Sequence, residues 1–214
     1  MNNDLSNLDF LLERLPELEA CKEQIIAAYE ILADCYDRGA CVYTCGNGGS
    51  AADAEHMVGE LLKGFVRKRP LCDEDKAAFL ALSAEEGAVL AEKLQYGLPA
   101  VSLMSQLSIN SAVSNDLGGE LGAAQQLFGL GMPGDVLVAF STSGNAKNVA
   151  YAAQVAKFRD MKIIGLSGRK GGKLAELADV CIRVPEDETY LIQELHLPVY
   201  HCLCIMIEAR YFEI

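Results

Sequence analysis

An imidazole and a carboxylate, His56 and Glu60, stand four residues apart in a stretch with helical periodicity. Four residues correspond to about 400° of rotation and about 6 Å of rise, so both side chains leave the same face of a helix. Such a pair suits acid–base catalysis or metal binding. Taken alone, it fits a structural hydrogen bond equally well, but its place just after a glycine-rich turn favours chemistry.

That turn, Gly46-Asn-Gly-Gly-Ser50, connects an apolar run to the helix of His56 and Glu60. Glycines permit positive φ angles and close approach of a ligand to the backbone, and the first turn of the helix offers free amides. The arrangement suits a phosphate or another anion. The dinucleotide pattern G-x-G-x-x-G is not satisfied, so a nicotinamide cofactor is not expected. The candidate ligand-binding residues of this turn are Asn47, Gly48, Gly49 and Ser50.

A second turn, Ser141-Thr-Ser-Gly-Asn145, also lies between an apolar run and a helical segment. By itself this turn fits helix capping and anion binding equally well, because Ser, Thr and Asn also cap helices. Two such turns in one sheet reinforce each other and favour a phosphorylated ligand held by amides and hydroxyls. The second turn contributes Ser141, Thr142 and Ser143 as candidates.

Further candidates lie near the C-terminus, in Ile192-Gln-Glu-Leu-His-Leu-Pro-Val-Tyr-His201. On an ideal helix Gln193 and His201 are about 12 Å apart along the axis and about 80° apart in direction. They can flank a shared ligand in two ways: from its two ends, or on a helix that Pro198 distorts. We interpret His196, on another part of the helix surface, as structural. A carboxylate and an imidazole on different helices suit proton transfer between adjacent carbons of a sugar.

Alternating strands and helices must position these residues. The predicted strands are 40–45, 100–104, 135–141, 162–166 and 180–184, with a helix around 106–113 and a long C-terminal helix to about Phe212. Strand 135–141 is a nearly continuous apolar run, typical of a strand covered on both faces. The alternation predicts an α/β fold with a doubly wound parallel sheet that binds ligands at the carboxyl ends of its strands.

Three other segments leave alternatives open. Two amphipathic helices, 5–15 and 17–38, either pack on the domain or mediate oligomer contacts. Segment 73–96 reads as two helices with a Ser83-x-x-Glu86 capping pattern, and it is too long for a simple connection, so it is a helical insertion, a lid or an interface. The basic patch 65–70 is either a solvated loop or a contribution to the anion site.

Composition limits the function classes. The chain has 214 residues, of which 51% are hydrophobic, and this predicts one domain with a sizeable core. A net charge of −12 argues against nucleic acid or an anionic membrane as the main partner. No signal peptide or membrane span is expected, which favours the cytoplasm. The cysteines lie mainly in apolar patterns and are interpreted as core thiols in a reducing compartment.

Jointly, several motifs resemble the phosphoheptose isomerases, which are sugar-isomerase (SIS) domain proteins. The motifs are Gly46-Asn-Gly-Gly-Ser-x-x-Asp-x-x-His56-x-x-x-Glu60, Ser114-Asn-Asp116, Ser141-Thr-Ser-Gly-Asn145, Gly171-Gly-Lys173 and Ile192-Gln-Glu-x-His196-x-x-x-x-His201. The resemblance covers the whole chain, 1–214, except the insertion at 72–97. It implies a single SIS domain with a five-stranded parallel sheet between helices, including N-terminal helices within 1–38. It also implies a homotetramer with active sites at subunit interfaces.

The resemblance further implies an activity, the isomerisation of sedoheptulose 7-phosphate to D-glycero-D-manno-heptose 7-phosphate through an enediol. By motif, Glu60 is similar to the general base and His201 to the general acid. A divalent metal, usually zinc, would be held by His56, Glu60, Gln193 and His201. The residues similar to sugar-phosphate contacts are Asn47, Gly48, Gly49, Ser50, Asp116, Ser141, Thr142, Ser143 and Gln193.

Three departures from the family pattern bear on the sugar more than on the chemistry: Ala146, the segment Lys63-Gly-Phe, and Tyr190. Members often have a Ser or Thr, an Arg and an Asp at these places. The alternative function is a non-catalytic sugar-phosphate-binding regulator, or a protein that binds the bacterial replication initiator. The presence of both Glu60 and His201 favours an enzyme.

Overall fold

Five parallel strands form the centre of the fold in a computed structural model that describes residues 6–212. The strands are β1 Val42–Cys45, β2 Ala100–Ser102, β3 Val136–Phe140, β4 Lys162–Ser167 and β5 Val180–Arg183. Their order is β2-β1-β3-β4-β5, and every neighbouring pair is parallel. All five strands lie within the predicted ranges or one residue beyond them. The order reverses between β1 and β3, which makes their carboxyl ends the expected ligand site.

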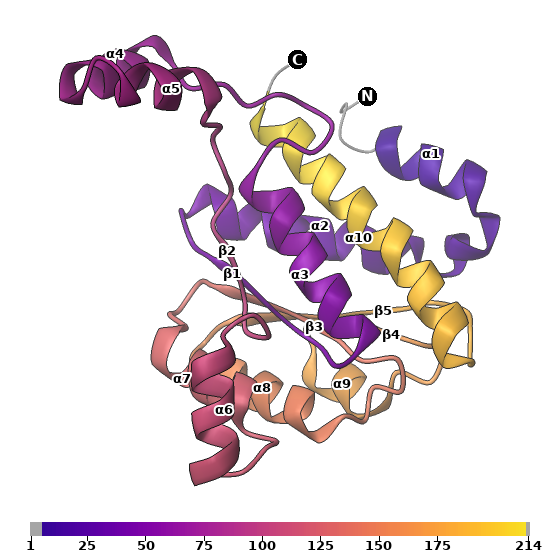
Figure 1. Cartoon of the computed structure of the whole chain (residues 1–214). Helices are drawn as coiled ribbons and strands as arrows, with labels where there is room; N and C mark the ends of the chain where they lie inside the picture. The colour runs from indigo at the N-terminus through magenta and orange to yellow at the C-terminus, as the bar shows by residue number, and fades with distance from the viewer. Residues whose placement is uncertain (1–5, 213–214) are drawn as a thin grey trace.

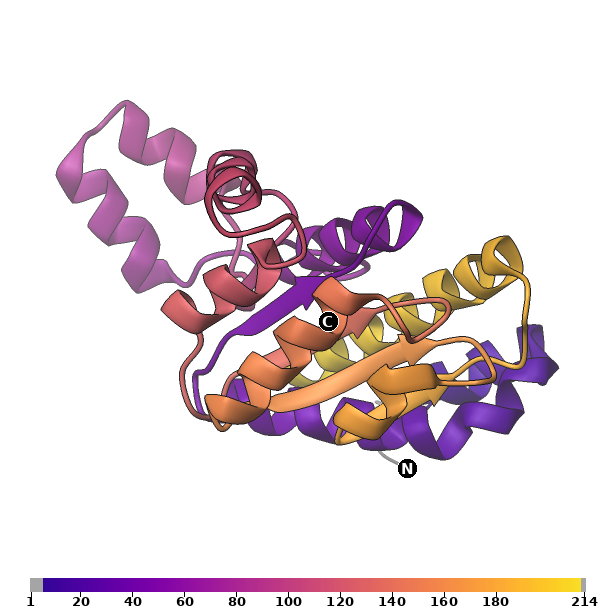
Figure 2. The ribbon, with the colours of Figure 1, turned by 90° about the horizontal axis from the view of Figure 1, so that it is seen from below.

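Helices cover both faces of the sheet, as Figures 1 and 2 show. One layer holds α1 Ser6–Arg14, α2 Lys22–Asp37, α3 Gly49–Leu62 and α10 Thr189–Tyr211. The other holds α6 Leu107–Asp116, α7 Gly122–Leu130, α8 Lys147–Phe158 and α9 Gly172–Leu177. Helix α7 has no counterpart among the predicted elements. The predicted α/β architecture with three layers is confirmed.

The central position of strand β3 in the sheet explains why its sequence is apolar throughout. All five of its residues are buried. Val136, Val138 and Phe140 belong to the core beneath α2 and α10, whereas Leu137 and Ala139 belong to the core beneath α8. Because successive side chains point to opposite faces, a central parallel strand must supply apolar groups to both layers.

The N-terminal region packs on its own domain. Leu8, Leu11 and Leu12 of α1 are buried, and α1 lies against α10. The predicted second helix, 17–38, begins as a 3₁₀ helix at Pro16–Cys21. The remainder of that segment is the α-helix α2. The predicted start of the first helix, Leu5, lies outside the described residues.

Helix α10 is the long core helix of the fold. Pro198 lies inside it, yet the helix runs from Thr189 to Tyr211 without a break. Within the described chain it alone has the length and apolarity to cross a membrane, but 56% of that window is buried inside the protein. Its mean hydropathy is therefore the signature of core packing.

The insertion forms a separate arm of two helices, α4 Asp73–Leu82 and α5 Glu86–Lys93. The amide of Glu86 donates to Ser83 Oγ at 3.3 Å, which confirms the capping pattern. The arm projects from the body of the molecule (Figure 1), and no residue of α4, all of which is described, is buried. Its two helices pack mainly against each other.

The eight cysteines all lie among the described residues, and all are free thiols. Burial raises the pKa of Cys45 and Cys202 to about 12. Such thiols stay protonated and unreactive at neutral pH, as the interpretation as core residues requires. Cys72 is the exposed one, and its Sγ caps α4 by accepting from the Asp75 amide at 3.5 Å.

Candidate active site

The glycine-rich turn joins β1 to α3 at the point where the strand order reverses. Gly48 has φ 55°, and a Cβ on Gly46 would lie 2.3 Å from the carbonyl oxygen of Ser50. Only glycine fits these two positions, because one needs a left-handed backbone and the other has no space for a side chain. Ser50 is buried at the start of α3, beside amides that the helix itself leaves free.

The second turn lies beside the first. The side-chain amides of Asn47 and Asn148 donate to each other at 2.8 Å in both directions, which links the first turn to α8. A Cβ on Gly144 would lie 1.9 Å from the carbonyl oxygen of Gly171, so the second turn rests against the start of α9. The structure thus brings two predicted anion turns to one edge of the sheet.

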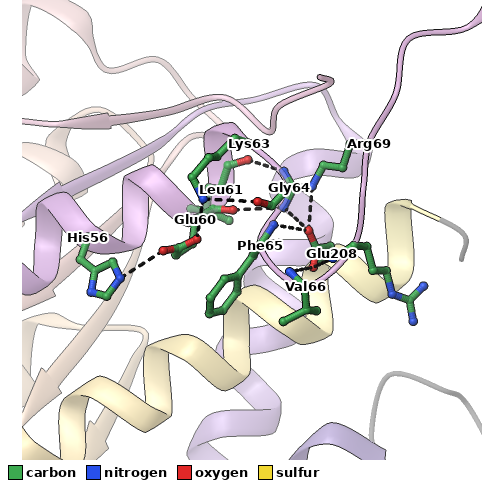
Figure 3. Close-up of polar contacts among 10 residues, drawn as sticks. His56, Glu60, Leu61, Lys63, Gly64, Phe65, Val66, Arg69 and Glu208 are labelled. Atoms are coloured by element: carbon green, nitrogen blue, oxygen red, sulfur yellow. Dashed lines mark hydrogen bonds and ion pairs between the residues drawn. The ribbon is translucent and has the colours of Figure 1, made fainter. Parts of the chain in front are cut away.

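His56 and Glu60 leave the same face of α3, as their spacing predicts (Figure 3). His56 Nε2 lies 3.1 Å from Glu60 Oε1, and Lys63 Nζ lies 3.2 Å from Glu60 Oε2. The Glu60 side chain is 12% exposed, so its carboxylate is largely shielded while two cationic or hydrogen-bonding groups face it. Lys63 was not among the predicted site residues; its place three residues after Glu60 was the available signal.

His201 reaches the same place from α10. The rings of His56 and His201 are 4.9 Å apart between centroids and nearly perpendicular, at 88°. Burial, and then the neighbouring His56, lower the pKa of His201, and Glu60 opposes this. The imidazole is therefore neutral at neutral pH and able both to donate and to accept a proton. Its Nε2 is buried and lacks a hydrogen-bond partner in the described part of the chain.

Two further residues, Asp53 and Tyr200, support His56 and were missed by the sequence reasoning. The Tyr200 hydroxyl lies 2.9 Å from His56 Nδ1 and 3.3 Å from Asp53 Oδ1. Burial raises the pKa of the Asp53 carboxyl and of the Tyr200 hydroxyl above their ordinary values. Because the Glu60 carboxylate only accepts, His56 Nε2 is the donor toward it, and in the neutral ring Nδ1 is left as the acceptor of the Tyr200 hydroxyl. The sequence signal was Asp53 three residues before His56.

Gln193 lies at the other end of the site. A Cβ on Gly49 would lie 2.8 Å from Gln193 Nε2, so this amide contacts the glycine-rich turn. His201 is eight residues further along α10, about 12 Å along the axis. Within one chain the structure therefore groups Gln193 with the anion turn and not with His56, Glu60 and His201.

Asp116 and His196 complete the predicted set. Asp116 is the exposed last residue of α6 and accepts a hydrogen bond from Asn115 Nδ2 at 2.7 Å, and within the described residues it forms no hydrogen bond or ion pair with either turn. His196 is fully buried, its ring lies 6.2 Å from that of Phe140, and burial lowers its pKa to about 4. This agrees with a structural role for His196.

Neither reading of the basic patch 65–70 describes Arg69. Its side chain is fully buried and pairs with Glu208 at 2.9 Å, whereas Lys68 is exposed. Arg67 donates to the carbonyl oxygen of Phe212 at 2.6 Å. The patch is neither a purely solvated loop nor part of the anion site, because Arg69 is buried and paired with Glu208 inside the protein.

A groove of about 380 Å³ between α1 and α10 reaches His201. Phe10 and Leu197 line it with exposed apolar surface, and Arg14 and Glu194 add charges. The groove gives His201 an approach from the side opposite to α3.

Known proteins share both sequence and fold with this chain. Models of the SIS domain match residues 7–94 and 122–205. A phosphoheptose isomerase of Shewanella baltica is 39% identical over 202 residues, which cover 93% of this chain and 89% of the relative. A phosphoheptose isomerase structure from Neisseria gonorrhoeae has a TM-score of 0.72 and 32% identity, with 95% of each chain covered. Another from Francisella tularensis has a TM-score of 0.74 and 29% identity, with 94% of each covered.

The matched segments include strands from both halves of the sheet, and they contain the two turns and the His56–Glu60 helix described above. By sequence and by fold, this chain belongs to the phosphoheptose isomerase family of SIS-domain proteins.

Proposed function

We propose that the protein isomerises a ketose phosphate to an aldose phosphate, with sedoheptulose 7-phosphate as substrate and D-glycero-D-manno-heptose 7-phosphate as product. One observation carries this proposal: Glu60 on α3 and His201 on α10 meet around His56, on the helix that begins at the glycine-rich turn. Relatives named phosphoheptose isomerase support the choice of substrate. A regulator without catalysis would not need this carboxylate and imidazole in one site.

In the mechanism, the turns at 46–50 and 141–145 hold the phosphate, and the sugar extends toward Glu60. The Glu60 carboxylate removes a proton from C1 of the ketose and returns it to C2, so that a carbon-bound proton moves between neighbouring atoms. The neutral His201 imidazole moves a proton between the C1 and C2 oxygens, which turns the ketone into a hydroxyl and the hydroxyl into an aldehyde. Lys63 stabilises the Glu60 carboxylate before it takes the proton and after it has returned it.

A panel of C5 to C7 ketose phosphates tests the function. We expect sedoheptulose 7-phosphate to raise the melting temperature and to be converted to the aldose, since a ligand that binds the folded state stabilises it. Stabilisation by sugar phosphates without conversion of any of them would favour the regulator.

Loss of a single phosphate-binding hydroxyl should act mainly on substrate affinity. We expect Ser50→Ala and Ser141→Ala each to raise KM about 10-fold or more, because a hydrogen bond to a charged group contributes about 1.5–3 kcal/mol. Ser50 and Ser141 are buried members of the two turns, whereas Ser105 is exposed and donates to Glu55. Ser105→Ala is therefore the control, and an unchanged KM in both turn variants would contradict the assignment.

A divalent metal, zinc by preference, fits the donor groups of the site. Two imidazoles and a carboxylate are common zinc ligands, and the buried His201 Nε2 has no partner among residues 6–212. In the described chain no three His, Cys, Asp or Glu side chains converge as a metal cluster. We therefore propose that His56, Glu60 and His201 hold the ion after a side-chain adjustment, with Gln193 supplied from a neighbouring subunit. Bound there, the ion would polarise the carbonyl and hydroxyl oxygens of the sugar.

Metal removal tests this proposal. We expect elemental analysis to find about one zinc per chain, and we expect dialysis against a chelator to lower kcat, with recovery when zinc is added back. Full activity in protein shown to be free of metal would remove the metal from the site.

We propose a homotetramer with active sites at subunit interfaces, in the cytoplasm. The arm α4–α5 supports the interface, because its helices of ten and eight residues are too short to be stable in water without further contacts. Eight unpaired cysteines support a reducing compartment.

A substitution on the arm tests the assembly. Leu82 is 83% exposed in the single chain, so Leu82→Glu should cost the isolated fold little. If the arm packs on another subunit, light scattering should show a smaller particle than the wild type. Leu107, which is 81% exposed on α6, provides the control Leu107→Glu. A Leu82→Glu protein of unchanged mass would exclude the arm from the interface.

A further inference from the structure

A buried carboxylate on α10 gathers the loop that follows α3. Glu208 is fully buried, and its two oxygens accept from the amides of three consecutive residues, Phe65 at 2.8 Å, Val66 at 2.9 Å and Arg67 at 3.0 Å (Figure 3). Arg69 Nε also donates to Glu208 Oε1 at 2.9 Å. All of the donors that surround this carboxylate thus come from one short loop.

The guanidinium of Arg69 faces back to the helix of the candidate base. Arg69 Nη2 donates to the carbonyl oxygen of Glu60 at 3.1 Å, and Nη1 donates to that of Leu61 at 2.6 Å. Carbonyls in the last turn of a helix have no partner within the helix. Arg69 satisfies two of them at α3, one of which belongs to Glu60 itself.

The other end of this connection lies on the helix of the candidate acid. Glu208 follows His201 by seven residues, which is close to two turns, so both leave the same side of α10. A buried ion pair contributes little net stability, because desolvation offsets the attraction. The ion pair does, however, hold two helices in a fixed arrangement, and a site built from two helices needs this.

We infer that Arg69 and Glu208 form a clamp that sets the distance between Glu60 and His201, and that both are positioning residues for the reaction. The inference rests on the proposed function of Glu60 and His201. The clamp links the backbone of Glu60 to α10 through two hydrogen-bonded side chains, and it also fixes the loop that begins beside Lys63. When the clamp is lost, the C-terminal end of α3 shifts relative to His201. The turns at 46–50 and 141–145 lie at the other end of α3 and keep their geometry.

Two variants test the clamp. Arg69→Lys keeps the charge pair but loses the forked donors to Glu60 and Leu61. The double variant Arg69→Met/Glu208→Gln removes both buried charges, while the new amide oxygen still accepts from the loop. Arg210→Met is the control, because Arg210 pairs with Asp37 at 2.7 Å and so joins α10 to α2 instead of α3.

The readouts are steady-state turnover and the spectrum of histidine labelled at Cε1, in protein shown to be folded at the assay temperature. The chain has three histidines, so each signal is assignable, and the buried His196 serves as an internal reference. We expect kcat to fall about 10- to 100-fold in both variants with KM within about threefold of the wild type, since small misplacements of catalytic groups have effects of this size. The His56 and His201 signals should move, and the His196 signal should not.

A kcat within about twofold of the wild type in both folded variants, a change confined to KM, or unmoved His56 and His201 signals would each overturn the clamp. If the wild type converts no ketose phosphate, the proposed function fails, and the histidine spectra still decide whether Arg69 and Glu208 position this pair.

Discussion

Replacement of Glu60 by Gln should lower kcat about 10²- to 10⁴-fold, because the amide cannot take a proton from carbon. The substitution keeps the shape of a side chain that is largely buried between His56 and Lys63, so the fold and KM should change little. Incubation of the ketose phosphate in heavy water provides the decisive measurement. The wild type should exchange the C1 proton with solvent, and Glu60→Gln should not.

Glu55 offers a matched control on the same helix. It is exposed and accepts from Ser105 Oγ at 3.1 Å, away from the site. Glu55→Gln should leave kcat and C1 exchange unchanged. If Glu60→Gln turned over and exchanged like the wild type, another group would have to be the base.

Replacement of His201 by Ala should lower kcat about 10²-fold, because proton transfer between the two sugar oxygens loses its carrier. The groove between α1 and α10 reaches this side chain, so the truncated site should admit free imidazole. We expect added imidazole to restore part of the activity in proportion to its concentration. Turnover assays with and without imidazole measure this effect.

The control for this variant is Glu194→Gln, because Glu194 lines the same groove from α10 and is exposed. Its kcat should match the wild type. A His201→Ala enzyme with normal kcat would exclude His201 from proton transfer, and a reduced kcat without any response to imidazole would point to a structural role.

The strands and most helices were predictable because they depend on local pattern. The continuous apolar run of β3, for example, predicted a central strand, and both core layers contact it. Helix α7 was not predicted, although its own residue Leu127 is fully buried. Its segment is rich in Gly, Ala and Gln, residues that give weak periodicity, and packing rather than pattern stabilises it there.

The candidate site divides in the same way. The pairing of His56 with Glu60 follows from their spacing on one helix, and so does the contact between Lys63 and Glu60. The approach of Tyr200 and His201 to that pair depends on how α10 packs beside α3, which no local pattern contains. Arg69 read as part of a surface charge run because its partner, Glu208, is 139 residues away.

The sequence by itself determined the doubly wound sheet, the two turns at its carboxyl edge and the face of α3 that carries His56 and Glu60, since all of these depend on residues close together along the chain. Only the tertiary structure decided that His201 meets His56 while Gln193 stays with the glycine-rich turn, and that a buried ion pair connects the end of α3 to α10. The physical reason is that the register between two packed helices is set by side chains distant in sequence, and that register fixes which polar groups share a site.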